Sequence, residues 1–115
     1  MSIETIDGMT VIRNSIIPPQ GYKCINIFGI LFAREGANIG DDTIRHERTH
    51  TLQMQELLYI GFYILYVIFF LWYFVRSWKW HESYERIPFE EEAEENEDDE
   101  TYNDNRKHYA WTAYV

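Results

Sequence analysis

The middle of the chain reads IRHERTHTLQMQELL over residues 44–58 and contains the pattern HExxH at residues 46–50. Residues four apart share one face of a helix, so the imidazoles of His46 and His50 can bind one zinc ion. Between them, Glu47 projects beside the metal and can take a proton from its bound water. The pattern therefore predicts a Zn²⁺ site that directs an activated water at a peptide carbonyl, with Glu47 as catalytic base.

The helix that carries HExxH is expected to begin near residue 43, because the acids and threonine of residues 41–43 suit an N-cap and first turn. From Leu57 to Val75 the chain has no charge, a length that suits a membrane span. A single span would leave His50 and any later ligand on opposite sides of the bilayer. A break near Gly61 avoids this and predicts an antiparallel hairpin of two helices, over about 43–59 and 62–79.

A third ligand must come from elsewhere in the chain, since catalytic zinc takes three protein groups and a water. The stretch FEEEAEENE at residues 89–97 places Glu90, Ala93, Glu94 and Glu97 on one helical face. The small Ala93 allows this face to approach the HExxH helix. We expect Glu90 to bind zinc and Glu94 to accept a hydrogen bond from a ligand histidine, which fixes that histidine's tautomer.

HExxH followed downstream by Glu-x-x-Ala-acid resembles the gluzincin metallopeptidases, particularly the membrane-associated CAAX-protease and heat-shock-protease group and the small minigluzincins. The resemblance covers about residues 43–97. It implies His46, His50 and Glu90 as zinc ligands and Glu47 as general base. Those families usually have Asp where this chain has Glu94. Asn96-Glu97 is also similar to the Asn-Glu-x-x-x-Asp of thermolysin-like enzymes, although Thr101 replaces that Asp, and this makes Glu97 a reserve ligand.

The N-terminal part is rich in β-forming residues. Residues 9–17 and 22–34 read as two strands around the turn Pro18-Pro19-Gln20-Gly21, which predicts a β-hairpin. Residues 1–8 are expected to be a loose terminus. By analogy with zincins, the strand at 22–34 is expected to hold a peptide or protein substrate by β-addition.

Composition limits the class of protein. The 115 residues suit one domain, 1–115, and one cysteine excludes an internal disulfide and a CxxC site. Lys and Arg number 10 against 19 Asp and Glu, so nucleic acid is not an expected partner. Residues 82–115, with 12 acids and 3 bases, carry the whole net charge of −9. The acidic run at 98–105 is expected to be a mobile linker to a short C-terminal segment.

The apolar residues 62–75 exceed what a small helical hairpin can cover. This predicts contact with a membrane surface or a homodimer formed through that helix. No signal peptide is visible, so a membrane-associated or cytoplasmic location is expected. The candidates for polarising a substrate carbonyl are His81, His108, Tyr84, Tyr102 and Tyr109.

Taken together, these patterns predict an α+β, mainly helical, zincin-like minidomain. Its parts are an N-terminal β-hairpin, an HExxH helix, an apolar return helix and a glutamate-bearing helix. The expected function is zinc-dependent peptide hydrolysis. Two alternatives remain open: a small membrane-anchored interaction protein with an acidic tail, in which two surface histidines form HExxH by accident, and a zinc-binding domain without catalysis.

Overall fold

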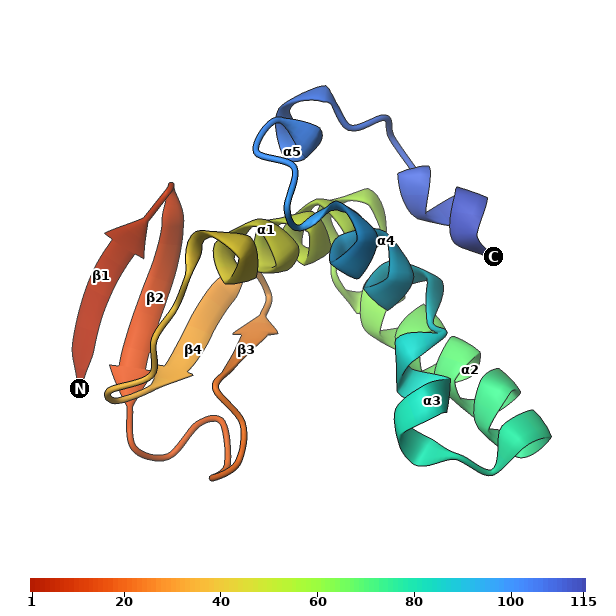
Figure 1. The fold of residues 1–115 in the computed structure, drawn as a ribbon, viewed down its shortest axis with the longest axis horizontal. Coiled ribbons are helices and arrows are strands. Elements are labelled where there is room, and N and C mark those ends of the chain that lie inside the picture. The colour runs from red at the N-terminus through yellow and green to blue at the C-terminus, as the bar shows by residue number, and fades with distance from the viewer.

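A four-stranded mixed sheet lies at one end of the molecule and helices form the rest, in the computed structural model of residues 1–115 (Figure 1). The predicted α+β class is confirmed. The strands, in the order β1-β2-β4-β3 across the sheet, are β1 (Ser2–Ile6), β2 (Met9–Asn14), β3 (Cys24–Ile27) and β4 (Ile30–Arg34). The helices are α1 (Asp41–Glu56), α2 (Ile60–Ser77), α3 (Trp80–Glu85), α4 (Pro88–Asn96), α5 (Tyr102–Asn105) and the 3-10 helix η1 (Ala110–Tyr114).

Two tight hairpins, joined side by side, build the sheet. β1 and β2 are antiparallel around Asp7-Gly8, and β3 and β4 are antiparallel around Phe28-Gly29. Both residues of each turn have positive φ, which is the pattern of the two-residue turns whose twist matches that of the strands. β2 and β4 pair in parallel, with Val11 opposite Leu31, and so make the sheet mixed.

The predicted hairpin of residues 9–17 with residues 22–34 is therefore wrong. The second stretch is two strands, because it reverses direction at Phe28-Gly29. Pro18-Pro19 lies in the connection between the two hairpins and not at the tip of one. The expectation of a loose terminus over residues 1–8 is also wrong, because β1 pairs with β2 along its whole length.

Helix α1 joins two separate clusters of buried apolar residues. The first packs Ile44 of α1 against the sheet residues Met9, Val11, Leu31 and Ala33. The second packs Met54, at the other end of α1, against Phe62, Ile87, Phe89 and Trp111. The HExxH residues lie between these two anchors, so the helix that carries them is held at both ends.

A sharp turn separates α1 from α2, just before Gly61. α1 ends at Glu56, Leu58 and Tyr59 have positive φ, and α2 begins at Ile60. Non-glycine residues rarely adopt such φ values, and a right-handed helix cannot continue through them. The expected break in the uncharged run is confirmed.

Helix α2 does not lead the chain back along α1. In Figure 1, α2 (green) runs away from α1, and α3 and α4 return beside it. Aromatic contacts hold this return: ring centroids lie 4.8 Å apart for Phe70 and Trp80 of α3, and 4.7 Å apart for Phe62 and Phe89 of α4. The expectation of an apolar return helix is wrong, because the aromatic face of α2 packs on α3 and α4.

The last third of the chain packs against α1 and α4. Asn103 of α5 accepts a hydrogen bond from Thr49 Oγ1 at 2.8 Å and donates to the carbonyl of Arg45 at 3.1 Å. In η1, Trp111 is buried against Phe89, with ring centroids 4.9 Å apart. The segment 98–105, expected to be a mobile linker, therefore contains a helix with specific contacts to α1.

Candidate metal centre

Three side chains expected to bind zinc lie together between α1 and α4. Nε2 of His50 lies 3.2 Å from Nε2 of His46 and 2.8 Å from Oε1 of Glu90. Oε2 of Glu90 lies 3.8 Å from Nε2 of His46. One ligand atom from each residue lies within 4.8 Å of the other two. We call these three residues the metal cluster, because together they can hold a metal ion.

The spacing of the donor atoms suits a small tetrahedral cation. Bonds of about 2.0–2.1 Å to nitrogen and oxygen place neighbouring ligand atoms roughly 3.3 Å apart. The two Nε2 atoms are 3.2 Å apart, and the shortest approaches to the Glu90 carboxylate are 2.8 Å from His50 to Oε1 and 3.8 Å from His46 to Oε2. Two imidazoles and one carboxylate are also a donor set that catalytic zinc sites use.

Local sequence explains why α4 presents Glu90 to α1. Pro88 begins the helix, where its missing N–H costs nothing and its restricted φ is already helical. Phe89 is buried in the second apolar cluster and fixes the rotation of the first turn. One turn after Glu90, Ala93 is fully buried, and its small side chain permits the close approach of the two helices that the sequence predicted.

The remaining nitrogens of the two imidazoles face polar side chains. Nδ1 of His50 lies 2.8 Å from Oε1 of Gln53, three residues later on α1. Nδ1 of His46 lies 3.5 Å from Oε1 of Glu97. Partners of this kind fix the tautomer and orientation of a histidine that binds a metal.

Glu94 does not accept the hydrogen bond from a ligand histidine that the sequence predicted. Its side chain is exposed, whereas Glu97 faces His46. The face of α4 toward α1 is centred between Glu90 and Ala93, so Glu94 falls at its edge and Glu97 lies within it. Glu97, the reserve ligand, therefore contacts the Nδ1 side of His46 and is not part of the metal cluster.

Gln53 is the residue of this centre that the sequence pattern did not indicate. It is fully buried, and its Nε2 donates to the carbonyl of Phe89 at 3.0 Å and to Oε1 of Glu92 at 2.9 Å. Its Oε1 faces His50. The available signal was its position, three residues after His50 on the same helix face. Gln53 thus links the imidazole to the backbone of α4.

A buried ion cluster lies behind Gln53. Nε of Arg106 is 2.6 Å from Oε2 of Glu92, and its Nη2 is 3.0 Å from Oε1 of Glu56. The hydroxyl of Tyr102 donates to Glu92 at 2.5 Å. At most 5% of the side chain of Arg106, Glu92 or Glu56 is exposed. The C-terminal segment is thereby tied to both helices of the metal cluster.

His50 and Glu90 form a buried pair with strongly shifted pKa values. Burial opposes ionisation of Glu90, but the two imidazoles outweigh it and hold the pKa of Glu90 far below its usual range. Burial likewise opposes protonation of His50, yet the Glu90 carboxylate raises the pKa of His50 to about 9. A cation held by His50 and Glu90 would replace the proton that they share, because a metal requires the neutral imidazole.

A cleft of about 680 Å³ opens beside the metal cluster. Its walls include His50, Glu90 and Glu47, together with residues of β3, α2 and α3. Nδ2 of Asn26 in β3 donates to the backbone carbonyl of Glu47 at 2.9 Å and so positions this turn of α1. Burial raises the pKa of the Glu47 carboxyl, although both histidines oppose the rise.

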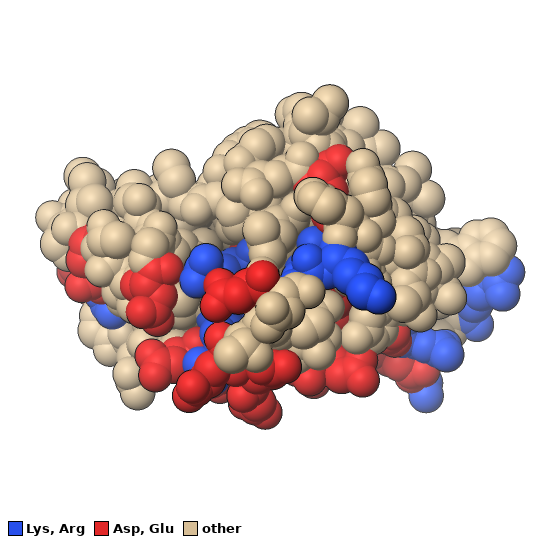
Figure 2. All heavy atoms as spheres, turned by 90° about the horizontal axis from the view of Figure 1, so that it is seen from above, with Lys and Arg blue, Asp and Glu red and all other residues tan.

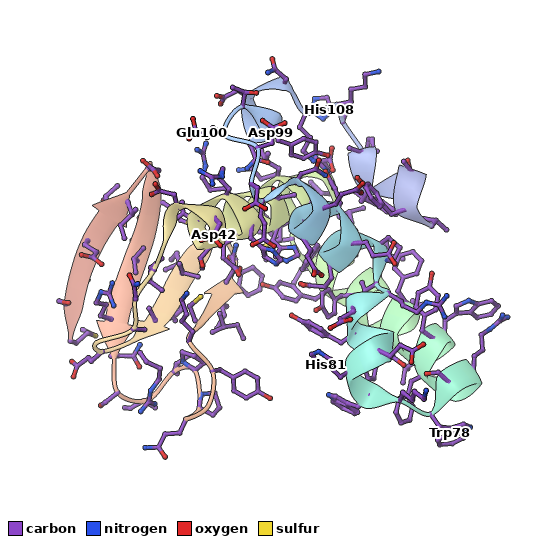
Figure 3. All side chains as sticks on the ribbon, viewed as in Figure 1. Asp42, Trp78, His81, Asp99, Glu100 and His108 are labelled. Atoms are coloured by element: carbon purple, nitrogen blue, oxygen red, sulfur yellow. The ribbon has the colours of Figure 1, made fainter.

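Of the five candidates for polarising a carbonyl, only His81 and Tyr84 line the cleft. Figure 3 shows His81 on α3 in the lower part of the view, whereas His108 lies in the upper part, together with Asp99 and Glu100. The hydroxyl of Tyr84 donates to Oε1 of Glu90 at 3.3 Å. His108, Tyr102 and Tyr109 instead contact the acids of the buried ion cluster.

No protein-family model, curated protein or solved structure matches the chain. The likeness to gluzincins therefore remains one of residue pattern, carried by HExxH and the glutamate helix.

Proposed function

We propose that the protein is a zinc-dependent peptidase. The observation that carries this proposal is the meeting of His46, His50 and Glu90 around one point, with Glu47 on the wall of the adjoining cleft. An accidental HExxH gives no reason for a carboxylate forty residues later to lie against both histidines. The metal cluster accounts for that arrangement directly.

The donor set favours zinc over the harder divalent cations. Mg²⁺ and Ca²⁺ prefer six or more oxygen ligands, whereas two imidazoles and a carboxylate suit Zn²⁺ with one position free for water or substrate. When bound, Zn²⁺ supplies Lewis acidity that makes a water nucleophilic near neutral pH. Gln53 and Glu97 orient the imidazoles for this role.

Glu47 is the proposed general base. It lies next to His46 on the same turn of α1 and lines the cleft beside His50 and Glu90. Only its backbone carbonyl is held by neighbours, namely Asn26 and Thr51, so the carboxylate is free to accept a proton. The upward direction of its pKa makes the carboxylate a stronger proton acceptor than an exposed glutamate.

An extended peptide is the proposed substrate. β3 is an edge strand of the sheet, and Cys24, Ile25 and Asn26 of this strand line the same cleft as Glu47. A free strand edge binds extended chains through main-chain hydrogen bonds. We assign Tyr84, across the cleft on α3, to donate a hydrogen bond to the carbonyl under attack, in place of its bond to Glu90.

The test compares the wild type with Glu47→Gln, which keeps the shape of the side chain and removes its basicity. Both proteins should bind one zinc per chain, because Glu47 is not a ligand. A peptide library incubated with each zinc-loaded protein, and read by mass spectrometry, should show cleavage only by the wild type. Loss of the base is expected to slow hydrolysis by about 10²–10⁴-fold.

His46→Ala is the control for the metal and should lose stoichiometric zinc. Equal cleavage by wild type and Glu47→Gln contradicts the base assignment. A wild type that binds zinc and cleaves nothing is a zinc-binding domain without catalysis, and one that binds no zinc has no metal site.

A further inference from the structure

Helix α2 has a long apolar face that nothing in the protein covers. Six residues lie within about 100° of arc along the helix, and each is 52–60% exposed: Ile60, Ile64, Val67, Ile68, Leu71 and Val75. We call these residues the α2 stripe. Only 6% of the residues in this 18-residue helix are buried, whereas the core helix of a soluble protein is mostly buried. A continuous apolar surface of this kind marks an interaction site.

The opposite face of α2 is already occupied. Phe62 and Phe69 pack on Phe89 of α4, and Phe69 also contacts Trp111 of η1. The helix therefore cannot turn its stripe inward without losing the second apolar cluster. The stripe has to be covered from outside.

We propose that α2 lies flat in the surface of a lipid bilayer, with the α2 stripe among the acyl chains and the metal cluster outside them. A helix with one apolar face and amphipathic residues at its borders is the usual form of such an in-plane anchor. This proposal does not depend on peptidase activity.

The residues at the end of α2 are those that favour the bilayer surface. Trp72, Trp78 and Trp80 are 53%, 75% and 70% exposed, and indole rings prefer the headgroup region. The guanidinium of Arg76 lies 3.9 Å above the ring of Trp72, and Lys79 comes shortly after it. Cations in this position are attracted to anionic headgroups.

Charge is distributed in the way that this orientation requires. Figure 2 shows Asp and Glu gathered along the lower edge of the view, and Lys and Arg in the middle and at the right-hand end, where α2 ends in Figure 1. Residues 82–115, which carry the net negative charge, include α4 and α5. An anionic surface would repel that side and attract the end of α2.

The length of α2 alone would also permit a membrane crossing, since its 18 residues have a mean hydropathy of 1.7. Helix α3 argues against a crossing. It packs back along α2, with Trp80 against Phe74 at 5.9 Å and Tyr84 against Tyr66 at 6.2 Å between ring centroids. A crossing α2 would carry the carboxylates of α3 into hydrocarbon, which is costly.

A second copy of the chain is the competing occupant of the stripe. Soluble interfaces normally have a polar rim around an apolar centre. The stripe is instead bordered by Trp72 on one side and by Tyr63 and Phe74 on the other. No acidic residue lies on α2. Lipid fits this border better than a protein surface.

The experiment is sedimentation of the full chain with mixed phosphatidylcholine–phosphatidylglycerol vesicles. The wild type should bind, and Ile68→Glu should bind at least about tenfold more weakly, because it places a charge halfway along the length of the stripe. The matched control is Ile16→Glu, which makes the same change at a loop position that is 78% exposed. It should bind as the wild type does.

Zinc content should be the same in all three proteins. A loss of vesicle binding can therefore be distinguished from a loss of the metal site. Protease added outside the vesicles should digest both the sheet and η1, and protection of either end would show a crossing. The proposal is overturned if the wild type does not bind vesicles or if the two variants lose binding equally. A lipid-free dimer that Ile68→Glu dissociates would overturn it in favour of a second copy.

Discussion

Glu90 of α4 and Glu97, the residue that caps the end of this helix, face different nitrogens of the two histidines. Glu90 contacts Nε2 of His50 at 2.8 Å, inside the metal cluster. Glu97, two helical turns later on the same face, lies 3.5 Å from Nδ1 of His46. One carboxylate therefore faces the metal position, and the other faces the far side of an imidazole.

Glu90→Gln and Glu97→Gln should therefore weaken zinc binding to different extents. Loss of an outer partner such as Glu97 typically lowers metal affinity by about 10–100-fold. Loss of the ligand Glu90 should exceed that, because the remaining two imidazoles cannot complete the site. Competition of each variant with a chelator of known affinity measures both effects.

Glu94→Gln is the matched control on the same helix, and its zinc affinity should equal that of the wild type, since its side chain is exposed. If Glu97→Gln lowers zinc affinity more than Glu90→Gln does, then Glu97 is the ligand and Glu90 is the outer partner.

Among the helices, the segment from α5 to η1 contacts both α1 and α4. Arg106 pairs with Glu92 on α4 and with Glu56 at the end of α1. The amide of Gln53 joins this ion cluster to His50. The orientation of Glu90 therefore depends on residues that come after it in the chain.

Arg106→Met should destabilise the protein by about 3–5 kcal/mol at pH 7, because it leaves buried carboxylates without a partner. The effect should depend on pH. Burial opposes ionisation of Glu92, but hydrogen bonds from Arg106, Gln53 and Tyr102 outweigh it and lower the pKa of Glu92 below 4.5. Because the folded-state pKa is the lower one, the stabilisation is present above about pH 4.5 and is lost as the pH falls below it.

Urea unfolding at several pH values measures this difference. Lys79→Met, which removes the exposed pair with Glu82 at 3.7 Å, is the control and should cost less than about 1 kcal/mol. A cost for Arg106→Met that stays constant from pH 7 into the acid range would contradict the assignment to Glu92.

Across the protein as a whole, the metal cluster joins α1 to α4 over forty residues of intervening chain. A ligand that binds only the folded arrangement stabilises it by mass action. A metal bound by the cluster would close the region between His50 and Glu90, which includes α2 and α3, into a loop. Zinc should therefore stabilise the entire fold.

Zinc at 100 times its dissociation constant should add about 2.7 kcal/mol and raise the Tm by roughly 10 °C, and EDTA should reverse the rise. Differential scanning calorimetry measures the shift. The double variant His46→Ala/His50→Ala should show no zinc-dependent change, whatever its own Tm. An equal shift in that variant would place the zinc elsewhere on the chain.

Local sequence was sufficient for the features that depend on spacing along one helix. HExxH placed both imidazoles on one face, the pattern around Ala93 placed Glu90 toward α1, and the incompatibility of a single span with the metal site indicated the break before Gly61. The first two follow from helical geometry, and the third follows from the chain connection between His50 and a later ligand.

The contacts between elements could be known only from the folded arrangement. The direction of α2, the parallel pairing of β2 with β4 and the burial of Glu92 beside Arg106 depend on which surfaces meet. Glu92 shows the reason: in sequence it is one acid among several, and only a guanidinium fourteen residues later makes its burial favourable. Spacing along a chain specifies faces, whereas packing free energy selects which faces come together.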